Sequence, residues 1–198
     1  MTSHKPSPPG TAAADERTAR MIRVDHAGEY GAVRIYQGQL AVLGKDMARD
    51  PEAARAHAAI TDMVDKERRH LEAFEDMITA RRVRPTALSP LWHAAGFALG
   101  AGTALLGTKA AMVCTTAVEE VIEEHYAGQL ADLGGDDPEL AAMVEEFRDD
   151  EIAHGAVARD FDAGGEDGAA AKAPGPYDAL AGVIKAGSRL AIWLSTRI

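Results

Sequence analysis

Apolar residues recur along the chain at the spacing of helices, and prolines separate one apolar segment from the next. In the first segment, for example, Ile22, Ile35, Leu40 and Val42 are apolar positions in a run without proline. Proline removes a backbone donor and is well tolerated only in the first turn of a helix, so the prolines mark helix boundaries. We therefore expect helices over residues 15–47, from residue 51 onward, and over 91–133, 138–162 and 177–198.

Four long helices followed by a shorter fifth predict an all-α bundle. Asp136 and Asp137 stand before Pro138, and aspartates are good helix-capping residues, which supports a helix start there. Residues 1–15 contain three prolines and no apolar period, so they predict a disordered arm ahead of one domain over 16–198. The Gly- and Ala-rich segment 163–176 predicts a connector before the last helix.

The composition of the chain excludes some classes of binding partner and of metal site. The chain has 198 residues, enough for one domain, and a net charge of −10, which argues against binding a nucleic-acid backbone. The lone Cys114 excludes an intrachain disulfide and a four-thiolate metal site. Any bound metal would need oxygen and nitrogen ligands. No apolar stretch resembles a signal peptide, which favours a bacterial intracellular protein.

Two segments bear on membrane binding. Residues 85–108 contain no Asp, Glu, Lys or Arg, and predict either a membrane-spanning helix or a buried or membrane-surface helix; their Ala and Gly content favours the second. The last segment sets apolar residues and Trp193 among Lys185, Arg189 and Arg197. Such an amphipathic helix suits either an anionic membrane surface or ordinary core packing.

An internal repeat relates the first expected helix to the third, and the second to the fourth. Glu29, Tyr36, Gly38, Gln39 and Leu40 recur 90 positions later as Glu119, Tyr126, Gly128, Gln129 and Leu130. The pattern D-x-E-x-x-H occurs at residues 65–70 and again at 149–154. Of the seven histidines, only His70 and His154 have a Glu three residues earlier, so the repeat selects both pairs.

These repeated residues predict a dinuclear metal site. Residues three apart on a helix share a face, so each pair presents a carboxylate and an imidazole to one ion. Four carboxylates and two imidazoles on four helices are typical of ferritin-like di-iron or di-manganese proteins, and redox chemistry favours iron. The predicted ligands are Glu29, Glu67, His70, Glu119, Glu151 and His154.

Some neighbouring residues have alternative interpretations. Glu120 competes in register with Glu119, although the Tyr-x-Gly-Gln-Leu match favours Glu119. Glu123 is either a further ligand or proton shuttle, or a surface residue, and the surface position is favoured. Candidates for orienting the imidazoles from outside the ligand set are His26, Asp65 and Asp149.

The sequence RVDHAGEYGAVRIYQGQLAVLG at residues 23–44 resembles the bacterial and mitochondrial demethoxyubiquinone hydroxylases, which belong to the ferritin-like superfamily. The resemblance covers nearly everything after residue 20, through residues 82–107, 117–130, 147–154 and 184–198. It implies two Fe ions per chain on the same six ligands. Glu29 and Glu119 would bridge the two ions or shift their coordination as O2 enters. It also implies hydroxylation of a polyprenylated methoxy-methyl-benzoquinol (demethoxyubiquinol) to 3-demethylubiquinol, using O2 and electrons from NADH.

The resemblance further implies that Tyr126, with His125 beside it, and Arg189 take part in electron delivery. Trp193 departs from the family, since mitochondrial relatives often carry Tyr there. A long-tailed quinol lies in the bilayer, so we expect a peripheral protein on the cytoplasmic face of a bacterial inner membrane. Accessory proteins of ubiquinone biosynthesis are candidate partners.

Two other functions use the same residues. A ferroxidase, peroxidase or tRNA-hydroxylating relative would need the same six ligands, although the negative charge weighs against tRNA. A membrane-associated assembly factor would retain the site only as structure. Dependence of activity on a quinol separates the three.

Overall fold

The computed structural model describes residues 11–163 and 176–198, which form helices joined by short turns. In chain order, the helices are α1 (Thr11–Leu43), α2 (Pro51–Arg81), α3 (Ser89–Leu105), α4 (Thr108–Leu133), α5 (Pro138–Ala163) and α6 (Pro176–Ser195). The described ranges contain no strand, so the expected all-α class is confirmed.

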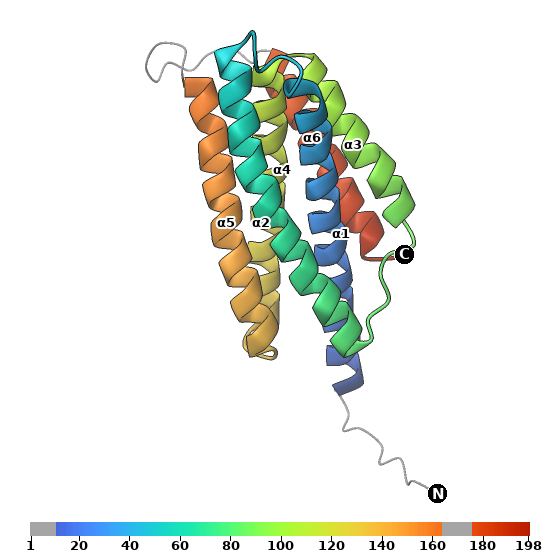
Figure 1. Ribbon diagram of the computed structural model, residues 1–198. Helices are drawn as coiled ribbons and strands as arrows, with labels where there is room; N and C mark the ends of the chain where they lie inside the picture. The colour runs from blue at the N-terminus through green and yellow to red at the C-terminus, as the bar shows by residue number, and fades with distance from the viewer. Residues whose placement is uncertain (1–10, 164–175) are drawn as a thin grey trace, which may run out of the picture.

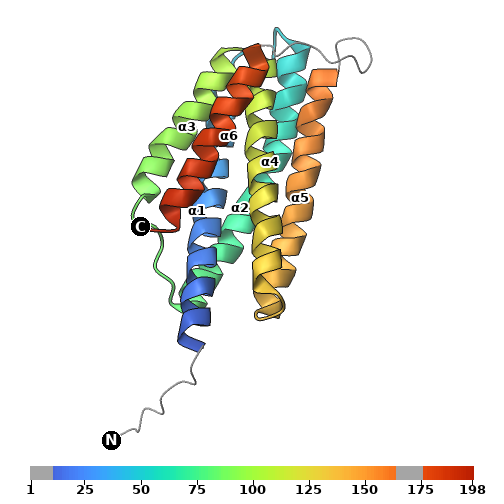
Figure 2. The ribbon, with the colours of Figure 1, turned by 180° about the vertical axis from the view of Figure 1, so that it is seen from behind.

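The four repeat-bearing helices α1, α2, α4 and α5 form a bundle in which α1 lies against α2 and α4 against α5. Helix α3 packs along α1 and α6 packs along α4, so these two helices cover one side of the bundle, away from α5 (Figures 1 and 2). The large side chains that are fully buried in the core include Ile22, Ile60, Phe74, Leu133 and Leu140.

The single helix expected over residues 91–133 is wrong, because the chain reverses between α3 and α4. Gly107 has a φ of 109°, which L side chains rarely adopt, and it breaks the helix there. No proline marks this break, so the pattern of prolines missed it. As a result, α3 runs back along the outside of α1, and α4 alone takes the third place in the bundle (Figure 1).

The helix ends differ from expectation in smaller ways. Helix α1 begins at Thr11, inside the segment expected to be a disordered arm, because Ala12, Ala13 and Ala14 are strong helix formers. Residues 1–10, and the connector apart from its ends, lie outside the described residues. The expected starts at Pro51 and Pro138 are confirmed.

Helices α1 and α3 approach each other through glycines. A Cβ atom at Gly100 would collide with the backbone carbonyl oxygen of Ile35, and one at Gly38 would collide with that of Phe97. Only glycine permits this contact between two helix backbones. Among the described helices, none combines the length and apolar character that crossing a bilayer requires.

Candidate metal centre and its apolar pocket

The four bundle helices bring the six predicted ligands together in the interior. Helices α1 and α4 contribute one glutamate each, and α2 and α5 contribute one glutamate and one histidine each. All six residues are buried, with at most 3% of their surface exposed: Glu29, Glu67, His70, Glu119, Glu151 and His154. Glu120, the rival of Glu119, faces outward and pairs with Arg159 and Lys185.

The six side chains form two overlapping groups, each with its candidate ligand atoms within 4.8 Å of one another. One group adds Glu29 and His70 to a shared pair, and the other adds Glu119 and His154. The shared pair is Glu67 and Glu151. The side chains common to both groups thus come from α2 and α5, whereas Glu29 and Glu119, which were expected to bridge or to shift coordination, each belong to one group.

The inward-facing polar atoms of this cluster have no hydrogen-bond partners. Both carboxylate oxygens of Glu67, Glu119 and Glu151 are buried and unpaired. The two histidines turn Nδ1 toward the carboxylates, with His154 Nδ1 3.0 Å from Glu67 Oε1 and His70 Nδ1 3.5 Å from Glu151 Oε1. Buried polar atoms are rarely left unsatisfied in proteins, so this donor set fits divalent cations.

The electrostatics of the cluster also favour a cation. Burial, together with repulsion from Glu151 and Glu29, holds the pKa of Glu67 well above its usual value. Burial and Glu151 do the same to the pKa of Glu119. Burial lowers the pKa of His70, but the nearby carboxylates of Glu151 and Glu29 outweigh this effect and raise the pKa to about 10. A site that raises an imidazole pKa in this way attracts positive charge.

The carboxylate that orients an imidazole is Asp150, not the expected Asp65 or Asp149. Asp150 Oδ2 lies 3.1 Å from His70 Nε2, and its Oδ1 accepts a hydrogen bond from Lys66 at 2.5 Å. Asp65 instead pairs with Arg68 on the surface. Asp150 was missed because its role depends on how α5 faces α2, which spacing within one helix does not reveal.

Tyr126 and His125 lie at the edge of the ligand cluster, on α4. The buried Tyr126 hydroxyl donates a hydrogen bond to Glu29 Oε1. His125 Nε2 lies 2.9 Å from Oδ1 of the buried Asp25, whose Oδ2 accepts a hydrogen bond from Gln129 at 2.7 Å. Asp25 was missed by the sequence analysis; its position one helical turn before Glu29 is the signal that could have indicated it.

Arg189 and Glu123 lie away from the ligand cluster. Arg189 is exposed on α6 and pairs with Glu124 at 2.8 Å, so the structure does not bring it together with the six ligands. Glu123 pairs with Arg148 at 2.8 Å, which agrees with the favoured surface position. His26 is buried on α1, and its Nδ1 has no partner.

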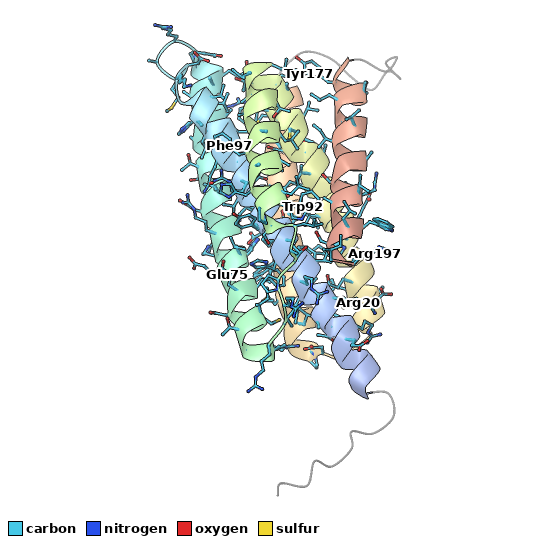
Figure 3. The ribbon with its side chains drawn as sticks, turned by 90° about the vertical axis from the view of Figure 1, so that its right-hand side faces the viewer. Arg20, Glu75, Trp92, Phe97, Tyr177 and Arg197 are labelled. Atoms are coloured by element: carbon cyan, nitrogen blue, oxygen red, sulfur yellow. The ribbon has the colours of Figure 1, made fainter. Side chains whose placement is uncertain are left out.

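An apolar pocket of about 320 Å³ lies beside the cluster, between α1, α3, α4 and α6. His125 and Tyr126 are part of its wall, and small residues such as Gly31, Gly96 and Gly187 leave the space open. Trp92 lies on α3 (Figure 3). Its 3.1 Å hydrogen bond to Ser195 connects α3 to the end of α6 at the pocket wall. The pocket therefore extends from beside the cluster to the helices that cover the bundle.

The covering helices expose apolar side chains to solvent. Leu105 and Leu106, at the end of α3, are 75% and 69% exposed, and Trp193 on α6 is 51% exposed. Two basic residues of α6 that the sequence offers for binding an anionic membrane surface form ion pairs within the chain, Lys185 with Glu120 and Arg189 with Glu124.

Known proteins share much of this sequence. Residues 16–195 match the family model of the ubiquinone biosynthesis protein COQ7. The 3-demethoxyubiquinol 3-hydroxylase of Rhodospirillum rubrum is 51% identical over 179 residues, which cover 90% of this chain and 77% of the relative.

Mitochondrial relatives match over similar shares. The NADPH-dependent 3-demethoxyubiquinone 3-hydroxylase of Homo sapiens is 48% identical, and the 5-demethoxyubiquinone hydroxylase of Saccharomyces cerevisiae is 39% identical. Each alignment covers 90% of this chain and 77% of the relative. With a family model matched over most of its length, the chain belongs to the ubiquinone biosynthesis protein COQ7 family.

Proposed function

We propose that this chain is a 3-demethoxyubiquinol 3-hydroxylase that holds two iron ions on Glu29, Glu67, His70, Glu119, Glu151 and His154. The observation that carries the proposal is the buried, unpaired donor cluster directly beside an apolar pocket. Four carboxylates without thiolates suit iron, and the pocket suits an apolar ring. The names of the relatives supply the substrate class.

The iron ions would supply the reduction of O2, which side chains cannot perform. The chain's own residues fix the geometry. Glu67 and Glu151 bridge the two halves of the cluster, and Asp150 holds the His70 ring with Nδ1 turned inward. The Tyr126 hydroxyl holds Glu29 by a hydrogen bond, so that carboxylate keeps one oxygen turned away from the cluster.

The pocket would bind the quinol ring and keep water away from it. Its volume of about 320 Å³ lies at the lower end for small-molecule sites, enough for a substituted ring and the start of its tail. The remaining isoprenoid tail would leave between the covering helices. Exposed Leu105, Leu106 and Trp193 would then rest on the membrane that holds the tail, with the protein bound peripherally.

The electron donor is a nicotinamide cofactor in this proposal. The family resemblance implies NADH, whereas the names of mitochondrial relatives specify NADPH. The residues described contain no strand, so they offer no Rossmann-type dinucleotide site. Parallel assays with NADH and NADPH at equal concentration would identify the donor.

Isotope incorporation tests the proposed reaction. The iron-loaded chain is supplied with a short-tailed demethoxyubiquinol, a nicotinamide donor and ¹⁸O2, and the product is analysed by mass spectrometry. We expect one labelled oxygen on the ring. Iron oxidation that proceeds equally well without the quinol, and yields no hydroxylated ring, would instead indicate a ferroxidase.

A variant separates the enzyme from an assembly factor. His70→Ala removes one predicted ligand, so we expect the demethoxy intermediate to accumulate in cells at unchanged protein level. Unaltered ubiquinone synthesis in that strain would support a scaffold role and contradict the proposal.

A further inference from the structure

Asp25 and His125 form an acid–imidazole pair outside the six-ligand cluster. His125 Nε2 lies 2.9 Å from Asp25 Oδ1, and Gln129 occupies the other carboxylate oxygen. Burial raises the pKa of Asp25. Burial lowers the pKa of His125, but the hydrogen bond that its Nε2 donates to Asp25 outweighs this effect and raises the pKa. The hydrogen-bond partners of the buried Asp25 are therefore His125 and Gln129, neither of which is a predicted ligand.

The internal repeat is broken at this pair. The cluster residues, Tyr126 and Gln129 all have an identical counterpart in the other half of the chain, but Asp25 corresponds to Thr115 and His125 to Ile35. The hydrogen bond from Gln129 to Asp25 is mirrored by one from Gln39 to Thr115, at 3.2 Å. The two repeat-related sites thus keep the same scaffold, and only the one formed by Asp25 of α1 with His125 and Gln129 of α4 carries an acid and a base.

The Asp25–His125 pair faces the apolar pocket. Asp25, His125 and Ile35 all belong to the pocket wall. Nε2 of His125 is engaged by Asp25, whereas its Nδ1 has no hydrogen-bond partner among the described residues and is not among the fully buried unpaired atoms. In a pocket with mostly apolar walls, Nδ1 is available to a ligand.

We propose that His125 Nδ1 accepts a hydrogen bond, and then the proton, from a ring hydroxyl of the bound quinol, and that Asp25 is the positioning residue that holds His125 for this role. The inference deepens the proposed function and rests on it. Because His125 donates its Nε2 hydrogen to Asp25, the lone pair of the imidazole is on Nδ1, where it would face the quinol ring.

The proton transfer is balanced within the pair. The O–H bond of the ring breaks, an N–H bond forms at Nδ1, and the electron pair stays on the ring oxygen. The imidazolium that results is stabilised by the Asp25 carboxylate, in the way that a buried aspartate supports a catalytic histidine. The ring is thereby oriented and made richer in electrons before oxidation.

Binding measurements test the inference without turnover. The full chain is loaded with Mn²⁺ in the absence of O2 and titrated with a short-tailed demethoxyubiquinol or with its quinone, while the fluorescence of the pocket residue Trp92 is followed. Only the quinol has hydroxyl hydrogens to donate, so native protein should bind it about tenfold more tightly than the quinone. Trp193→Phe leaves Trp92 as the single tryptophan.

Asp25→Asn should remove this preference. The amide can donate to Nε2, which moves the imidazole hydrogen to Nδ1 and abolishes the acceptor. We expect loss of the quinol preference and a fall in kcat of about 10²-fold or more, with an unchanged manganese count. His125→Gln, which keeps a polar partner for Asp25 but has no ring, should show the same loss, and Asp25→Glu should partly restore it.

The matched control is Asp65→Asn, the same substitution at an exposed aspartate that pairs only with Arg68. It should retain the quinol preference. If Asp25→Asn and His125→Gln keep the preference and kcat of the native chain, the inference is overturned while the proposed function stands. If the native chain binds neither ring, the proposed function fails with it.

Discussion

Replacing Glu119 with Gln should stabilise the metal-free protein and weaken its response to metal. Glu119 is 1% exposed, its two oxygens have no partner, and burial beside Glu151 raises its pKa well above the usual value. Without a cation, this carboxyl group destabilises the folded chain. An amide of the same shape removes the charge and donates to Glu151, so the metal-free fold becomes more stable.

The size of each effect follows from the environment of Glu119. Relief of one unsatisfied buried group contributes about 1–3 kcal/mol, and 1 kcal/mol moves the midpoint of a chain of this size by about 2–4 °C. Metal-free Glu119→Gln should therefore melt about 2–12 °C above the native chain. Each ion present at 100 times its Kd adds about 2.7 kcal/mol, so two ions raise the native midpoint by about 10–20 °C. The variant should gain about half of that rise.

Differential scanning calorimetry with and without Mn²⁺ measures both effects. Glu120→Gln is the control, since Glu120 is the next residue of α4 and its surface pairs with Arg159 and Lys185 contribute about 1 kcal/mol at most. The control should melt slightly lower and keep the full rise with Mn²⁺. A Glu119→Gln variant that behaves like this control would refute the reasoning.

Other predictions concern pH, packing and the membrane. The metal-free protein should lose stability, on the order of 5 kcal/mol, as the pH rises from 6.5 to 10, because the folded pKa of His70 is about 10; melting curves of the Mn²⁺-loaded chain should lack this loss. Gly100→Val should lower the urea midpoint by several tenths of a molar or more, because its side chain meets the Ile35 backbone; an unchanged midpoint would contradict the close approach. Leu106→Glu and Trp193→Glu should reduce sedimentation with anionic vesicles while leaving the iron count intact, whereas unchanged sedimentation would exclude this face.

The bundle could be predicted from the chain because prolines and the internal repeat identify its four helices. The reversal at Gly107 could not, since a glycine inside a Gly- and Ala-rich stretch is compatible with a continuous helix. The reversal depends on a tertiary contact. Gly38 and Gly100 let α3 lie directly on α1, and that contact exists only when the chain turns back.

The side chains of the candidate site were predictable where a pattern within one helix selects them. The E-x-x-H pairs and the repeat indicated Glu119 rather than Glu120, and the structure brings Glu119 into the cluster. The sequence analysis did not identify Asp25 and Asp150, because each contacts a histidine of another helix. The membership of Glu67 in both ligand groups likewise depends on how four helices converge, which the spacing within one helix does not show.

Iron bound per chain, after anaerobic reconstitution with ferrous ion, tests the central claim most directly when the native protein is compared with Glu67→Ala. Glu67 belongs to both ligand groups, so the account predicts two irons in the native chain and a loss at both positions in the variant. Glu72→Ala, an exposed glutamate on the same helix, should keep two. One iron or none in the native chain, or two in Glu67→Ala, would contradict the account.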